Sequence, residues 1–181
     1  LTISVENDIH GAAALIPTLA GNSAKIKNVI LKNVNISSSH YAGGIWGYTT
    51  SDDCWISVTN CHVNGGTITA NLYNSDNADK VGGIGGIFYT GTVSDCSVKN
   101  VTISGYRDTA GIVGWAADTR ATIKNNTIEN VTINVNNTTN YKNYTNRAQY
   151  DVNNYVGEGV GKAKLEGNTG EATINWGSIA E

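Results

Sequence analysis

The sequence of 181 residues predicts an all-β fold, namely a right-handed parallel β-helix of about five coils with loop inserts on one edge. Three observations predict it. Two short phrases recur with a minimal unit of about 28 residues, a period typical of solenoids. Asn and Gly return at fixed places in each unit, where a chain can turn a corner. No segment carries a sustained 3.6-residue apolar stripe, so helix is disfavoured.

The first phrase predicts a Gly-rich strand in each unit. It reads Gly-Gly-Ile-Trp-Gly in its clearest copy. The copies, including a looser one near each end, cover 13–17, 43–47, 82–86, 110–114 and 157–161. Gly residues let neighbouring backbones approach closely, as a stacked coil requires.

The second phrase predicts two further strands of about three to five residues in each unit. Val29 and Leu31 share one strand face, and Val34 and Ile36 share another, so the chain must turn between Leu31 and Val34. The copies cover 26–36, 58–68, 93–103 and 123–133, with a worn fifth copy at 165–174. The corner positions hold Asn33, Gly65, Asn100 and Asn130, and an earlier corner holds Asn28, Asn60, Asp95 and Asn125.

Stacking of the units predicts one continuous core, because equivalent Ile and Val residues lie about 4.8 Å apart in successive coils. Corner Asn side chains are expected to hydrogen-bond along the stack as a ladder. Cys61 and Cys96 occupy the same place in neighbouring units, so we expect a buried thiol pair in preference to a disulfide. Cys54 has no equivalent in the repeat and is expected to be an exposed thiol.

Two long inserts leave the unit at the same point, just after Ile68 and Ile133, so both are expected on one edge of the solenoid. The first includes residues 71–77 and the second runs from Asn134 to about Tyr155. A third excursion, 48–55, leaves from a different corner.

Composition narrows the class of protein. Charged residues make up 15%, and the net charge of −3 with a pI near 5.6 argues against a nucleic-acid binder. No apolar run is long enough to span a membrane. The length fits a single domain, 1–181, and because it starts at Leu1 and contains no Met we expect a fragment of a longer protein.

The repeated phrases resemble those of bacterial cell-surface proteins with GLUG-type repeats, whose units carry a Gly-Gly-Ile/Leu-x-Gly segment followed by an Ile-x-Asn-Cys-x-Val-like segment. The resemblance covers about 9–175 and rests on 43–47, 82–86 and 110–114 with the segments 58–63, 93–98 and 123–128 that follow them. It implies a β-helix in an adhesin-like, secreted or surface-located protein, and it implies no known active site.

Catalytic chemistry has little support in the sequence, so we expect no enzyme and assign no catalytic residue. Glycoside hydrolysis needs two facing carboxylates, whereas Asp52 and Asp53 are adjacent in a loop. The three His residues lie at unrelated positions in the unit, and the segment 74–79 has calcium-ligand composition without a closing Glu. We therefore expect no metal site and no cofactor. A column of Thr67, Thr102 and Thr132 is weak support for ice binding.

Aromatic composition favours recognition, because nine Tyr and four Trp accompany one Phe, and these side chains suit exposed contacts. Trp46 is expected to point outward, since it stands between two inward positions. The partner would be a glycan or a surface protein, and the alternatives are a structural spacer or a polysaccharide-active enzyme. The oligomeric state is left open. The candidate binding residues are Trp46, Tyr73, Asn74, Asp76, Tyr141, Tyr144, Arg147 and Tyr150.

Overall fold

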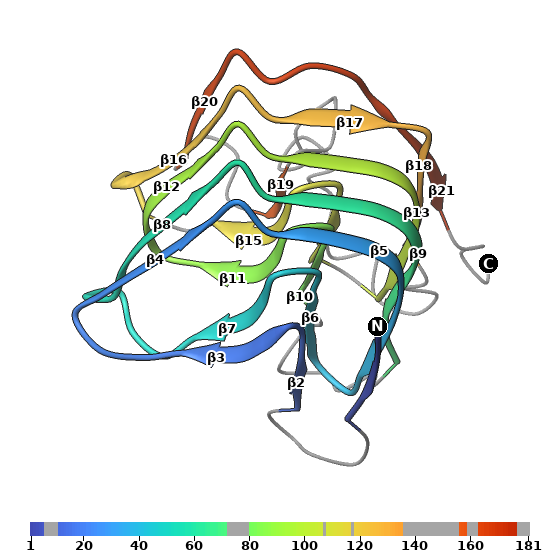
Figure 1. Ribbon diagram of the computed structural model, residues 1–181, viewed down its shortest axis with the longest axis horizontal. Coiled ribbons are helices and arrows are strands. Elements are labelled where there is room, and N and C mark those ends of the chain that lie inside the picture. The colour runs from blue at the N-terminus through green and yellow to red at the C-terminus, as the bar shows by residue number, and fades with distance from the viewer. Residues whose placement is uncertain are drawn as a thin grey trace, which may run out of the picture.

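The fold is a parallel β-solenoid, seen in a computed structural model that describes residues 1–5, 11–71, 80–106, 108–116, 118–135, 156–158 and 163–176 (Figure 1). Every regular element in these residues is a strand, and every pairing between strands is parallel. Among them no helix is long and apolar enough to cross a membrane. The predicted all-β parallel β-helix is confirmed.

The strands form four parallel sheets that run along the solenoid axis. Sheet A contains β1 (Thr2–Ser4), β5 (Ile30–Ser38), β9 (His62–Ala70), β13 (Ser97–Gly105), β17 (Thr127–Glu129), β18 (Val131–Val135) and β21 (Ala172–Trp176). Sheet B contains β2 (Ala12–Ala13), β6 (Tyr41–Gly43), β10 (Lys80–Gly82) and β14 (Asp108–Ala110). Sheet C contains β3 (Ile16–Leu19), β7 (Trp46–Thr49), β11 (Gly85–Phe88), β15 (Val113–Ala116) and β19 (Val156–Glu158). Sheet D contains β4 (Ser23–Lys27), β8 (Trp55–Thr59), β12 (Thr90–Ser94), β16 (Ala121–Lys124) and β20 (Lys164–Glu166).

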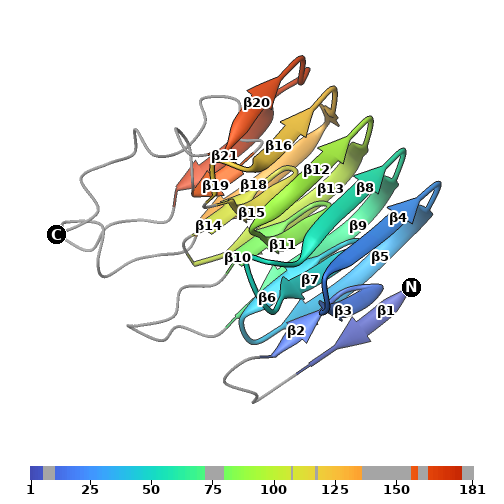
Figure 2. The ribbon, with the colours of Figure 1, turned by 90° about the vertical axis from the view of Figure 1, so that its left-hand side faces the viewer.

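Each coil visits sheets B, C, D and A in that order, and successive coils stack with their repeats in register. Ile36 pairs with Ile68, which pairs with Ile103, and Ile103 pairs with Ile133. Four coils are described on all four sheets, and a fifth follows in β19, β20 and β21 (Figure 2). Viewed from the first coil in Figure 1, the chain turns clockwise as it recedes, so the solenoid is right-handed.

The corners lie at the predicted positions. All seven Asn and Asp residues predicted there have positive φ, between 49° and 60°, and Gly65 has φ 81°. Asn and Asp tolerate this left-handed conformation better than other residues with a side chain. The corner side chains also form the expected ladder: Asn60 Nδ2 donates to Asn28, and Asn130 Nδ2 donates to Asn100.

Two details of the elements differ from the prediction. The strands of sheet A are nine residues long in three coils, because ladder pairing continues on both sides of the left-handed corner. The Gly-rich phrase does not form one strand. It bends at its second and third residues and contributes one strand to sheet B and another to sheet C. The coil therefore has four sides, and the alternation of inward and outward residues is interrupted at that bend.

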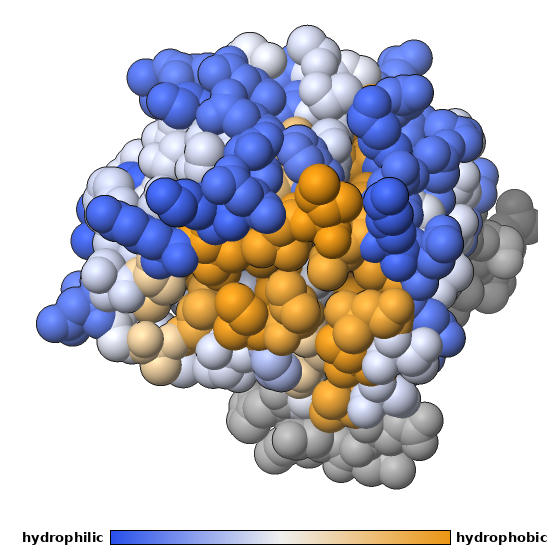
Figure 3. Space-filling view, viewed as in Figure 1, coloured by the Kyte–Doolittle hydropathy of each residue, from blue (hydrophilic) through white to orange (hydrophobic). Residues whose placement is uncertain are grey.

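The core is a set of apolar columns inside the four sheets, with Ile, Val, Ala and Cys buried in successive coils. At the end formed by the first coil, this apolar interior reaches the surface (Figure 3). Exposed apolar residues of this part of the chain include Leu1, Leu15 and Ile30.

Candidate functional site

A group of aromatic residues gathers on the outer side of sheets B and C. We define the aromatic strip as Tyr41, Tyr48, Tyr89 and Trp115. Tyr41 begins β6, Tyr48 is in β7, Tyr89 links β11 to β12, and Trp115 is in β15, so three successive coils contribute. Tyr41 is buried, whereas the other three side chains are partly exposed.

The repeat places two of these residues in equivalent positions. The residue directly after each Gly-rich phrase is Tyr48 in the second coil, Ile87 in the third and Trp115 in the fourth. Tyr48 pairs with Thr18, and Ile87 pairs with Trp115, all pointing out of sheet C. This column is the signal in the sequence that could have located the strip.

Ring contacts arrange the four residues of the strip in two pairs. Tyr41 and Tyr48 are stacked, with ring centroids 5.1 Å apart and an interplanar angle of 16°. Tyr89 meets Trp115 edge to face at 5.2 Å. Such geometries are favourable for aromatic pairs beyond the area they bury. The Lys80 ammonium lies 6.0 Å from the centre of the Trp115 ring, at the outer limit for a cation–π contact.

Lys80 is itself fixed by a largely buried ion pair. Its Nζ lies 2.9 Å from the Asp108 carboxylate in the next coil, and the two side chains are only 13% and 2% exposed. Lys80 and Asp108 are directly paired across β10 and β14, and Lys80 is also paired with Tyr41. Opposite charges in register offset each other's desolvation cost and fix the coils beside the strip.

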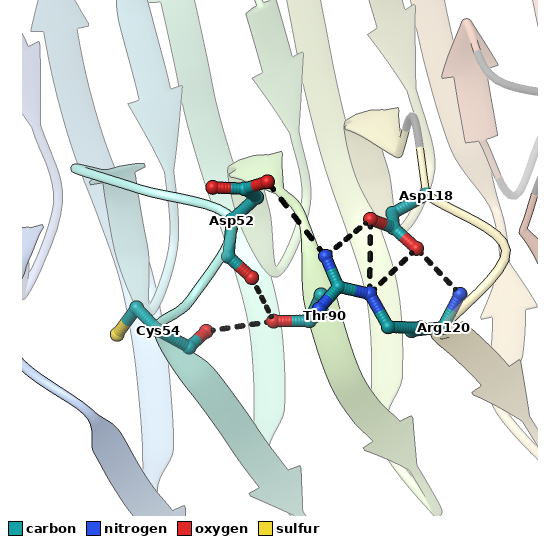
Figure 4. A network of polar contacts seen from close by, with 5 residues as sticks. All are labelled: Asp52, Cys54, Thr90, Asp118 and Arg120. Atoms are coloured by element: carbon teal, nitrogen blue, oxygen red, sulfur yellow. Dashed lines mark hydrogen bonds and ion pairs between the residues drawn. The ribbon is translucent and has the colours of Figure 1, made fainter.

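A network of charged residues lies at the adjacent corner, where sheet C leads to sheet D (Figure 4). Arg120 Nε and Nη2 donate to both carboxylate oxygens of Asp118, at 2.7 to 3.1 Å. Arg120 Nη2 also lies 3.7 Å from Asp52 of the coil two below. The buried Thr90 hydroxyl, between them, donates to the backbone carbonyls of Asp52 and Cys54. Two loops and the start of strand β12, from three coils, thus meet at one place.

The electrostatics of this corner follow from these contacts. Hydrogen bonds from Arg120 lower the pKa of the Asp118 carboxyl from 3.8 to about 2, so it stays ionised. Burial raises the pKa of the Tyr89 phenol, and the nearby Tyr48 and Asp52 raise it further. The Tyr89 hydroxyl therefore keeps its proton and can donate a hydrogen bond.

The expectation that Trp46 points outward is wrong. Its side chain is 0% exposed and lies inside the solenoid, where its ring packs on Gly85 of the next coil. A Cβ at Gly85 would lie only 2.2 Å from the Trp46 ring, so the glycine makes room for the indole. The indole Nε1 donates to the Ile87 carbonyl at 2.7 Å. The alternation of inward and outward side chains does not hold here, because the chain bends immediately before Trp46. Ile45 and Trp46 therefore both face inward.

The cysteines are all free and buried. The predicted buried thiol pair of Cys61 and Cys96 is confirmed, with the Cys61 amide donating to Cys96 Sγ at 3.4 Å. The pKa of the Cys96 thiol is raised by its hydrogen bond with Cys61 and by burial. The expected exposure of Cys54 is wrong: the side chain is 0% exposed, and burial raises its pKa.

The other candidate binding residues lie in or near the two long inserts, outside the residues that the structure describes. They are Tyr73, Asn74, Asp76, Tyr141, Tyr144, Arg147 and Tyr150. Their assignment stays a prediction. The first insert is flanked by β9 of sheet A and β10 of sheet B, and the second by β18 of sheet A and β19 of sheet C. Both inserts therefore follow a strand of sheet A. The aromatic strip therefore begins at the edge from which both inserts leave.

Among the described residues, no group of three His, Cys, Asp or Glu side chains could hold a metal ion. Comparison with family models, curated proteins and solved structures finds no match to this chain. The resemblance to surface proteins with GLUG-type repeats accordingly stays a prediction.

Proposed function

We propose that this chain is a recognition module of a secreted or surface-located protein, which binds a glycan or a protein partner without catalysing a reaction. One observation carries the proposal: a partly exposed aromatic strip crosses three coils and begins at the edge from which both long inserts leave. Aromatic rings with polar tips are well suited to contact surfaces. The regular coils supply a rigid support for such contacts.

The corner network supports binding more than catalysis. General acid catalysis would need a carboxyl group that holds its proton near neutral pH. Arg120 has the opposite effect on Asp118, whose pKa falls to about 2. Both oxygens of that carboxylate also accept hydrogen bonds from the same guanidinium. Such a pair is suited to hold a fixed arrangement of donors and acceptors.

A structural spacer in a longer surface protein is the second candidate. It is favoured by the apolar interior that reaches the surface at the first coil (Figure 3). A further β-coil stacked there would cover these side chains in the manner of the coils within the solenoid. A spacer, unlike a recognition module, would have no ligand for the strip.

Arrays of glycans and of extracellular matrix proteins, probed with the 1–181 chain, test the proposal. We expect specific binding to at least one ligand, reduced by Trp115→Ala in the strip or by Tyr141→Ala and Tyr144→Ala in the second insert. Thr67→Ala, on the outer face of sheet A, is the control and should bind as the unchanged chain does. Absence of specific binding on both arrays would favour the spacer.

A further inference from the structure

We propose that the aromatic strip and the corner network together bind a neutral polysaccharide chain that lies along the solenoid axis. This inference rests on the proposed recognition function and names the ligand class for the described part of the surface. It is carried by the juxtaposition of partly exposed rings with a preorganised set of carboxylate and guanidinium groups.

The rings are spaced along the axis as a linear glycan requires. Tyr48, Tyr89 and Trp115 come from three successive coils, so the strip extends over two strand spacings, or about 10 Å. An extended sugar chain places about two residues in that length. Each sugar ring has an apolar face of C–H groups, which packs on an aromatic side chain, and hydroxyl groups at its rim, which need hydrogen-bond partners.

The corner supplies those partners beside the rings. Asp52 and Arg120 are 63% and 49% exposed, and Tyr89 directly precedes Thr90, whose hydroxyl donates to the Asp52 backbone carbonyl. A carboxylate or a guanidinium can bind two neighbouring hydroxyl groups at once, because each presents two parallel partners in a plane. Arg120 is already oriented by Asp118, so little conformational entropy is lost when a ligand binds.

The charges at the corner favour a neutral ligand. Asp52, Asp53 and Asp118 contribute three negative charges and Arg120 contributes one positive charge, which gives −2 in all. Lys80 near Trp115 is already paired with Asp108. A uronate or sulfate-bearing polymer would meet net repulsion here, whereas neutral hydroxyl groups would not.

Affinity electrophoresis tests the inference, with xyloglucan, galactomannan, mixed-linkage β-glucan and branched α-glucan as neutral probes and polygalacturonate and heparin as anionic ones. We expect at least one neutral polymer, and neither anionic one, to retard the chain. Trp115→Ala and Asp52→Ala should each raise the Kd about tenfold, equivalent to about 1.4 kcal/mol. Tyr89→Phe, which keeps the ring and removes the hydroxyl, should have a smaller effect.

Ile30→Ala is the control, because Ile30 is an apolar side chain that is 63% exposed on β5 of sheet A, away from both the strip and the corner network. It should leave the retardation unchanged. Circular dichroism verifies that each variant is folded. Absence of retardation by all four neutral polymers, or an equal loss in Ile30→Ala, would overturn the inference. Protein binding that depends on Trp115 without any glycan binding would overturn the ligand class and leave the recognition function standing.

Discussion

One buried residue shows how polar groups are satisfied inside the solenoid. Asn126 is 0% exposed and occupies the position that Cys61 and Cys96 hold in earlier coils. Its Oδ1 accepts from the Cys96 amide at 2.9 Å, and its Nδ2 donates to the Val93 carbonyl at 3.1 Å. Cys96 makes the same two contacts one coil below, with the Cys61 amide and, at 3.9 Å, with the Val58 carbonyl. Cys61, Cys96 and Asn126 therefore form one column inside the solenoid, and we call this column of hydrogen-bonded side chains the inner ladder.

Asn126→Ala should lower the free energy of unfolding by roughly 2–6 kcal/mol, because a buried amide and a buried carbonyl each lose a partner worth about 1–3 kcal/mol. Urea denaturation followed by circular dichroism measures the change. Cys96→Asn is the matched variant: it supplies the same acceptor and donor, so we expect a loss below 1 kcal/mol. Equal destabilisation by the two variants would contradict the ladder as the source of the effect.

Asp118 should titrate with a midpoint of about 2, below its ordinary pKa of 3.8. A lowered pKa in the folded state adds stability above the unfolded pKa, and this contribution is lost as the pH falls through about 2. Carboxyl chemical shifts in an NMR pH titration measure the midpoint. Arg120→Ala should return it toward 3.8, since that guanidinium is the main cause of the shift. A midpoint near 3.8 in the unchanged protein would contradict the observed pairing.

At the scale of elements, Trp46 of β7 packs on Gly85 of β11. A double-mutant cycle can measure the interaction energy between these two positions. The first and fourth coils have Ile16 and Val113 at the position paired with Trp46 and Gly85. A Val side chain therefore fits this position when its neighbours are of ordinary size. Gly85→Val alone should destabilise strongly, because its side chain would collide with the indole. Trp46→Val alone should cost about 2–5 kcal/mol for the cavity it leaves.

The double variant Trp46→Val/Gly85→Val should be more stable than the sum of the single effects predicts, by about 1–3 kcal/mol. Thermal and urea denaturation of the four proteins give this interaction energy. Additive effects would show that the two side chains do not share one space. Gly85→Val combined with Asn126→Ala is the control and should be additive, because Asn126 lies at the corner between β16 and β17, away from Gly85.

At the level of elements, the sequence predicts corners well because their chemistry is restrictive. A left-handed corner accepts few residue types, so Asn28, Asn60 and Asp95 indicate it directly. Orientation after the Gly-rich bend is harder to predict, because Gly44 and Ile45 carry no sign that two sheets meet there. The outward orientation predicted for the Trp46 side chain is wrong for that reason. The volume left by Gly85 in the paired position was the available clue.

The sequence signal for the aromatic strip is a column within the repeat itself, separate from the two inserts. Tyr48 and Trp115 follow the Gly-rich phrase at the same distance, which aligned copies display. Tyr89 and the corner at Arg120 could not be placed in this way. They belong to links of unequal length between sheets C and D, and only the folded chain brings those links together.

The whole solenoid should be most protected in its middle coils. Strands β9 and β13 have hydrogen-bonded neighbours on both sides, whereas β1 and β20 each have one neighbour among the described strands. In stacked repeats each unit is stabilised by its neighbours, so opening should start at the ends. Native-state hydrogen exchange should show the slowest amides in β9 and β13 and the fastest in β1, β20 and β21. Uniform protection across the stack would contradict opening from the ends.

The packing of Trp46 on Gly85 also restricts how the repeats of such a chain can evolve. Arrays of repeats gain and lose units by unequal recombination, and a unit survives the exchange only where its new neighbour fits. Removing the third coil would set the Trp46 indole against Val113, and duplicating the second would set one indole against another. The second and third coils should therefore be inherited as one block, with residues 46 and 85 changing together.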